Sequence, residues 1–118
     1  MKISDKVNVL GTEYAIVIKN HAHHIFSDCD GYCDRFSKEI VLCDFYNDQR
    51  FAGDSKACIE RILKKILRHE ITHAFLDESG LMENSYSCNA WAENEEMVDW
   101  FAIQGPKIYK SWKEAGAL

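Results

Sequence analysis

One short run, His69-Glu70-Ile71-Thr72-His73, has the residue types and spacing to bind and use a metal ion. Residues four apart lie one turn apart on the same face of an α-helix, so both imidazoles can reach one ion. Glu70 directly follows a ligand, and its carboxylate can take a proton from water held by the ion. The plainer interpretation is a pair of histidines satisfied by packing or solvent, but the H-E-x-x-H spacing favours the metal site.

Such a centre needs a third protein ligand, and no histidine follows the motif to supply it. The five histidines are His21, His23, His24, His69 and His73. The candidates are therefore a downstream carboxylate, an upstream histidine or a cysteine. Glu95 and Asp99 stand four apart, so one can bind the ion while the other accepts the free N–H of an ion-bound imidazole. Glu96 and Glu93 are alternatives to Glu95, although acidic residues also gather at helix starts because of the helix dipole.

A weaker cluster lies upstream, where a second metal site competes with ordinary loop histidines and buried thiols. Its residues are His21, His23, His24, Cys29 and Cys33. No matching second pair follows at zinc-finger spacing, which favours the ordinary interpretation. Cys58 and Cys88 are expected to behave as small hydrophobic residues.

The motif needs a helix to present it, and the sequence predicts one from Ser55, as the cap, to about Asp77. Apolar residues recur there at steps of three and four, which predicts one buried stripe. The stripe consists of Ile59, Ile62, Leu63, Ile66 and Leu67. Ser79 and Gly80 are expected to end the helix, because glycine tolerates the left-handed conformation found there.

A second helix, which carries the glutamates, is predicted over residues 90–104 after a polar loop at 84–89. Asn89 is its expected cap, Gly105-Pro106 its expected end, and residues 108–112 a separate helical turn. Its apolar positions are Trp91, Met97, Val98, Phe101 and Ala102. Aromatic side chains here could stack on nucleic-acid bases, but helical spacing favours the core. They are Trp91, Trp100, Phe101 and Trp112.

The first half of the chain predicts strands at residues 13–19, 31–34 and 39–43, the last two as a hairpin. Residues 47–54 are polar and predict a loop. Strands followed by helices indicate one α+β domain over residues 1–118. We expect a small, three-stranded antiparallel sheet packed on the two helices.

Composition narrows the classes of partner. The net charge is −5, from 14 basic and 19 acidic residues, whereas a general binder of phosphate backbones needs a basic surplus. No apolar window is long enough to span a membrane, and the N-terminus turns charged before a signal peptide could form. We therefore expect a cytoplasmic protein whose five cysteines are reduced thiols.

The H-E-x-x-H motif followed by Asn94-Glu95-x-x-x-Asp99 resembles the gluzincins of the thermolysin type. That resemblance implies that Glu95 is the third ligand and that Asp99 bonds His69. Residues 67–76, 78–81 and 94–102 also resemble small H-E-x-x-H proteins encoded by phages and prophages of Gram-positive bacteria. Those proteins are distantly similar to the ImmA/IrrE-like peptidases, and the resemblance implies a bacterial host cytoplasm.

The resemblance implies a zinc-dependent metallopeptidase in which His69, His73 and Glu95 bind Zn²⁺. Glu70 would be the general base, passing its proton to the leaving amine. An edge strand would hold an extended peptide or protein substrate, and residues 39–43 are the expected edge. Thermolysin-like enzymes also steady the oxyanion with Tyr or His, for which Tyr86 is the candidate. Tyr32 and Tyr109 are weaker candidates.

Two other functions stay open from the residues themselves. The zinc could be structural, in a regulatory module of phage origin that binds a protein partner and cleaves nothing. The chain could instead be a metal-free protein that binds nucleic acid or a repressor. Two histidines and one carboxylate also suit Fe²⁺, so the native metal is not fixed by the ligand set.

Overall fold

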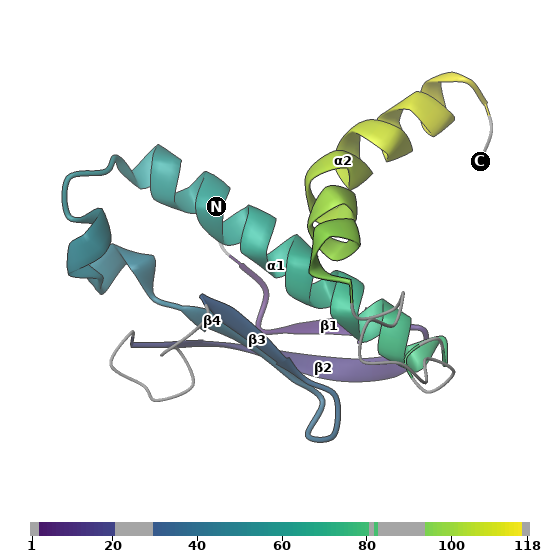
Figure 1. The fold of residues 1–118 in the computed structure, drawn as a ribbon, viewed down its shortest axis with the longest axis horizontal. Coiled ribbons are helices and arrows are strands. Elements are labelled where there is room, and N and C mark those ends of the chain that lie inside the picture. Colours follow the sequence, from purple (N-terminus) through teal and green to yellow (C-terminus); the bar gives the residue numbers. More distant parts are fainter. Residues whose placement is uncertain (1–2, 21–29, 81, 83–93, 117–118) are drawn as a thin grey trace.

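The computed structural model describes residues 3–20, 30–80, 82 and 94–116, with the side chains of 111–114 left out. Four strands, β1 (Lys6–Val9), β2 (Thr12–Lys19), β3 (Gly31–Asp34) and β4 (Glu39–Cys43), form one sheet in the order β1-β2-β4-β3. Two 3-10 turns, η2 (Phe45–Asn47) and η3 (Gln49–Phe51), lead to helices α1 (Lys56–Glu78) and α2 (Glu95–Glu114). Helix α1 lies across one face of the sheet, and α2 crosses α1 and projects away (Figure 1). The α+β fold class is confirmed.

The sheet differs from the prediction in its pairing. It is mixed, because β2 and β4 run parallel while β1–β2 and β3–β4 are antiparallel. Strand β1 was not predicted; it joins β2 through Leu10 and Gly11, both at positive φ (51° and 92°). Two such residues form the tight turn that suits a twisted hairpin.

The predicted edge strand is wrong. Strand β4 lies between β2 and β3, and four of its five residues are buried. A continuous apolar run is typical of a strand inside a sheet that includes parallel pairing. The edges among the described strands are β1 and β3, and β3 lies against α1.

Helix α1 forms as predicted. The Ser55 side chain accepts a hydrogen bond from the Cys58 N–H at 3.1 Å, and Gly80 follows the helix at φ 85°. Ile59 and Leu63 on its buried face join the core cluster of the sheet. This packing fixes the rotation of α1 and turns the motif toward β3 and α2.

Helix α2 begins later and ends later than predicted. Asn94 caps it, accepting from the Met97 N–H at 2.9 Å, whereas Asn89 lies outside the described residues. The helix continues through Pro106, which has no N–H to give the Ala102 carbonyl. Arg68 of α1 donates its Nε–H to that carbonyl instead. This bond satisfies the acceptor and ties the two helices together.

The prediction that the aromatic residues of this region lie in the core is wrong for Trp100 and Phe101. Among the described side chains of this helix, Val98 and Ala102 are buried, while Trp100 is 53% and Phe101 44% exposed. Trp91, and the side chain of Trp112, lie outside the described part of the chain. None of the described helices has a stretch apolar and long enough to cross a membrane.

The C-terminal end of α1 is held to the sheet through Glu78. Its carboxylate accepts from the buried Tyr14 hydroxyl at 2.7 Å and from the Thr12 hydroxyl at 2.9 Å. It also pairs with the Lys38 ammonium at 2.8 Å. The Lys38 and Tyr14 hydrogen bonds lower the pKa of Glu78 to about 2.

Because the pKa of Glu78 is lowered in the folded state, its stabilisation is present above the ordinary carboxyl pKa. It is lost as the pH falls toward about 2. We expect Glu78→Gln to lower the urea midpoint of unfolding at pH 7 and to flatten its decline between pH 5 and pH 2.5. Glu13→Gln is the control, because Glu13 pairs with Lys6 at the exposed surface. Equal acid sensitivity of Glu78→Gln and the parent would contradict this role.

Candidate metal centre

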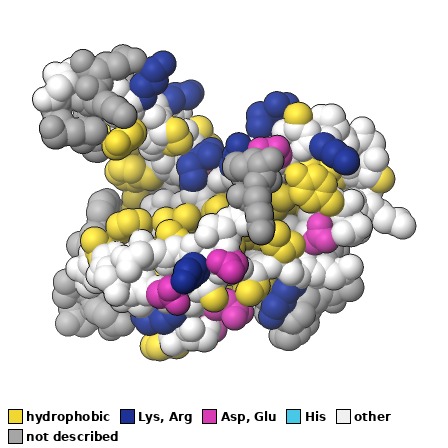
Figure 2. Space-filling view, turned by 180° about the vertical axis from the view of Figure 1, so that it is seen from behind, with side chains coloured by type: hydrophobic (Ala, Val, Ile, Leu, Met, Phe, Trp, Pro, Cys, Tyr) yellow, Lys and Arg dark blue, Asp and Glu magenta, His cyan; other side chains and the backbone are white. Residues whose placement is uncertain are grey.

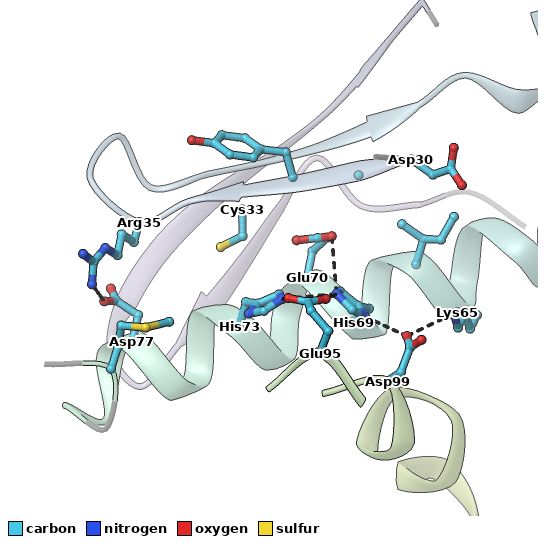
Figure 3. A pocket seen from close by; sticks show the side chains of 14 residues that line it. Asp30, Cys33, Arg35, Lys65, His69, Glu70, His73, Asp77, Glu95 and Asp99 are labelled. Atoms are coloured by element: carbon cyan, nitrogen blue, oxygen red, sulfur yellow. Dashed lines mark hydrogen bonds and ion pairs between the residues drawn. The ribbon is translucent and has the colours of Figure 1, made fainter. Parts of the chain in front are cut away.

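The motif residues face a cleft of about 560 Å³ between β3, α1 and the first turn of α2. His69, Glu70 and His73 each place a donor atom within 4.8 Å of the others (Figure 3). The two Nε2 atoms of the histidines lie 3.1 Å apart. Four-residue spacing on α1 therefore brings both imidazoles to one point, as the sequence predicted.

Glu95 closes the site from the second helix. Its carboxylate oxygens lie 3.0 Å from His69 Nε2 and 3.0 Å from His73 Nε2. Glu96, on the same turn, is exposed and does not line the cleft. Glu93 lies outside the described residues, so the structure favours Glu95 among the carboxylates it describes.

Asp99 lies one turn beyond Glu95 and holds His69 from behind, with 2.7 Å between Asp99 Oδ1 and His69 Nδ1. An ionised carboxylate only accepts, so the proton lies on Nδ1 and the Nε2 lone pair faces the cleft. Burial would raise the pKa of Asp99, but hydrogen bonds from His69 and Lys65 outweigh it and lower that pKa.

Glu70 is the buried carboxyl of the site, only 6% exposed. Among the described residues, His69 is the basic group nearest to this carboxyl. The distance from His69 Nε2 to Glu70 Oε1 is 3.9 Å, which is too long for a hydrogen bond. Burial raises the pKa of Glu70 to about 7, while His69 lowers it and Glu95 and Asp99 raise it further. A buried carboxyl with a raised pKa and no partner within hydrogen-bond distance among the described residues is a candidate for proton transfer.

The donor set fits a zinc ion. Around a tetrahedral ion with bonds of roughly 2.0–2.1 Å, ligand atoms stand about 3.3 Å apart. Here the two histidine Nε2 atoms are 3.1 Å apart, and each lies 3.0 Å from a different oxygen of Glu95, Oε2 for His69 and Oε1 for His73. Burial lowers the pKa of His73, which favours the neutral imidazole that binds metals. In the described part of the chain, no cysteine joins the cluster of His69, Glu70 and His73.

Strand β3 borders the cleft with an edge that no described strand covers. The Cys43 N–H donates to the Asp30 carbonyl at 3.0 Å. With the register of β3 and β4, this bond shows which residues of β3 direct their backbone groups toward β4. By antiparallel alternation, Gly31 and Cys33 point their backbone N–H and C=O groups away from β4. These groups are available to pair with an extended chain in the cleft.

Gly31 lets β3 approach the motif. A Cβ at this position would stand 2.7 Å from Ile66 Cγ2 and 3.2 Å from Glu70 Oε1. A glycine inside a strand signals such a close approach, so the sequence carried a sign of this contact. The residue keeps the edge strand and the buried carboxyl side by side.

We expect Gly31→Ala to destabilise the fold by about 1–3 kcal/mol, because the new methyl group overpacks the contact with Ile66. Urea unfolding measures the change. Gly53→Ala is the control, since a Cβ there meets nothing within 4 Å. A Gly31→Ala protein as stable as the Gly53→Ala protein would show that this contact is not tight.

Lys65 extends the chain of contacts behind His69. Its ammonium lies 3.0 Å from Asp99 Oδ1, the oxygen that also bonds His69. Lys65 and His69 lie one turn apart on α1, and both contact Asp99 of α2. The Lys65–Asp99 ion pair therefore links the two helices. Lys65 is a positioning residue that keeps Asp99 ionised and in place.

Because this ion pair is partly exposed, we expect Lys65→Gln to weaken zinc binding by roughly 3- to 10-fold. Loss of a direct partner of a ligand costs more, roughly 10- to 100-fold. Competition with a chromophoric chelator measures the affinity. Lys64→Gln is the matched control, because Lys64 pairs with Glu60 on the same helix and does not line the cleft. Equal zinc affinities of Lys65→Gln and Lys64→Gln would show that Lys65 does not position the metal site.

Several residues that the sequence singled out lie outside the part of the chain that the structure describes, or away from the motif. Tyr86 and the upstream cluster of His21, His23, His24 and Cys29 lie outside the described residues, as does Cys88. Tyr32 and Cys33 line the cleft, whereas Tyr109 lies on α2 in a separate groove. Burial, then the charges of Glu70 and Asp77, raise the pKa of Cys33 to about 12, so this thiol is neutral.

No protein-family model matches this sequence, and comparison with curated proteins and with solved structures finds no match to it.

Proposed function

We propose that this protein is a zinc-dependent metallopeptidase, with His69, His73 and Glu95 as the metal ligands. The observation that supports this most is the Glu95 carboxylate, 3.0 Å from Nε2 of each motif histidine. Two helices far apart in sequence supply the three donors, and Asp99 fixes the tautomer of one of them. When bound, zinc would polarise the scissile carbonyl and lower the pKa of coordinated water.

Glu70 is the general base of the proposed reaction. It accepts a proton from the attacking water at its carboxylate and passes that proton to the leaving amine. Its burial supports this role, because proton transfer needs a group whose pKa lies near the working pH. Helix α1 carries Glu70 together with His69 and His73, so the base and the two histidine ligands move as one rigid element.

The proposed substrate is an extended peptide, held along β3 rather than along β4. The outward backbone groups of Gly31 and Cys33 would pair with it as an added strand. Glu70 Oε1 lies close to Gly31, so a peptide on this edge passes the proposed base. The resemblance to phage and prophage proteins leads us to propose a bacterial host cytoplasm as the place of action.

The test combines metal analysis with a cleavage assay on the full chain. We expect about one equivalent of zinc by mass spectrometry, and cleavage within a library of internally quenched decapeptides. A chelator should stop cleavage and added zinc should restore it. Zinc below about 0.1 equivalents after loading would contradict the metal site. Stoichiometric zinc with no cleavage of any peptide would favour the non-catalytic, zinc-stabilised module.

A further inference from the structure

A second hollow lies between α1 and α2, lined by none of the residues that line the cleft. It is a groove of about 350 Å³. Its lining residues are Arg68, Ile71, Thr72, Phe75, Phe101, Gly105, Pro106 and Tyr109. Three of its aromatic side chains are open to solvent, with Phe75 42%, Phe101 44% and Tyr109 55% exposed. Figure 2, from behind, shows hydrophobic side chains bordering the hollow between the projecting helix and the rest of the molecule.

The dimensions of the groove suit a short helix. Its walls are the stretches 68–75 of α1 and 101–109 of α2. At about 1.5 Å per residue these stretches are roughly 10 and 12 Å long, about two helical turns. Such a length accepts two or three apolar side chains spaced i, i+4 and i+7.

The charge around the groove selects the occupant. Arg68 lines it, and among the described residues no acidic side chain does. Residues 103–113 contain three lysines and no acidic residue, although the whole chain carries −5. A partner with acidic residues beside its apolar face complements this surface.

Two other occupants fit less well. A second copy of the chain would bring the same basic residues together, which opposes pairing. A membrane surface binds the convex apolar face of a helix, whereas these residues line a hollow between two helices. We therefore propose that this groove docks an amphipathic helix of a partner protein, with acidic residues flanking its apolar face. This proposal does not depend on the metal site.

The probe is a fluorescein-labelled, 16-residue helical peptide with leucines at i, i+4 and i+7 and glutamates at the flanking positions. A second peptide has the same leucines flanked by lysines. Fluorescence anisotropy with the full chain should give saturable binding of the glutamate peptide. We expect the lysine peptide to bind at least tenfold more weakly, and 0.5 M salt to reduce the difference.

Variants locate the binding site. Phe75→Ser and Phe101→Ser should each weaken binding of the glutamate peptide by at least tenfold. Ile103→Ser is the matched control, since Ile103 is exposed on α2 but does not line the groove. Circular dichroism confirms that each variant keeps its helices.

Several results would overturn the proposal. These are no saturable binding of the glutamate peptide, equal binding of both peptides, and binding that Phe75→Ser leaves unchanged. Sedimentation that shows a dimer dissolved by Phe75→Ser would assign the groove to a second copy. Binding to phosphatidylglycerol vesicles that Phe75→Ser abolishes would assign it to a membrane.

Discussion

Replacing His73 with alanine will reduce zinc affinity by more than about 100-fold, because it removes one of three proposed ligands. Loss of an outer partner alone costs roughly 10- to 100-fold. His73 Nε2 lies 3.1 Å from His69 Nε2 and 3.0 Å from Glu95, so its loss breaks the donor set rather than its support. Equilibrium dialysis against buffered zinc, followed by mass spectrometry, measures the effect.

The second helix offers a matched pair of controls for this prediction. Glu95→Gln should also weaken zinc binding strongly, whereas Glu96→Gln, an exposed residue of the same turn, should leave it within about twofold of the parent. Retained stoichiometric zinc in His73→Ala would defeat the ligand assignment. Equal effects of the two glutamine variants would defeat the choice of Glu95.

Replacing Glu70 with glutamine will keep the zinc and abolish cleavage. Glutamine has nearly the same shape but cannot accept the proton, and loss of a general base costs about 10²- to 10⁴-fold in rate. The fold should tolerate the change, because it removes an ionisable group from a buried site. Cleavage of the best decapeptide substrate and zinc content are measured on the same preparation.

The control for Glu70→Gln is Glu60→Gln, a change of the same kind at an ion pair with Lys64 elsewhere on α1. That variant should cleave at the parent rate. If Glu70→Gln cleaves as fast as Glu60→Gln, another group is the base. If Glu70→Gln loses both zinc and cleavage, Glu70 is needed to hold the metal, and the loss of cleavage is then no evidence for its role as the base.

Local signals in the sequence predicted α1 and its motif well. The cap at Ser55, the apolar spacing and Gly80 all act within one helix, so they can be recognised without the rest of the fold. The orientation of the motif histidines follows from the same spacing. The contact of Asp99 with His69, implied by resemblance, is present at 2.7 Å.

The misplaced features depend on contacts between distant segments. Strands β2 and β4 pair in parallel although residues 20–38, which include β3, separate them in the sequence, and the same apolar run would suit either direction. Continuation of α2 through Pro106 depends on Arg68, a residue of the other helix, accommodating the freed carbonyl. The choice between Glu95 and Glu96 depends on how α2 is rotated against α1. None of these is encoded within a single segment.

The way α2 is attached has a consequence for how the molecule opens. Its main described contacts are with α1, including the bond from Arg68 to the Ala102 carbonyl, whereas α1 is the described helix that packs on the sheet. Subglobal opening can therefore release α2 and carry Glu95 and Asp99 away while the sheet stays folded. The proposed zinc ion, bound by residues of both helices, would add its binding energy to the closed form by linkage. If the proposed zinc site is correct, the supply of zinc would then set the fraction of molecules whose cleft is assembled.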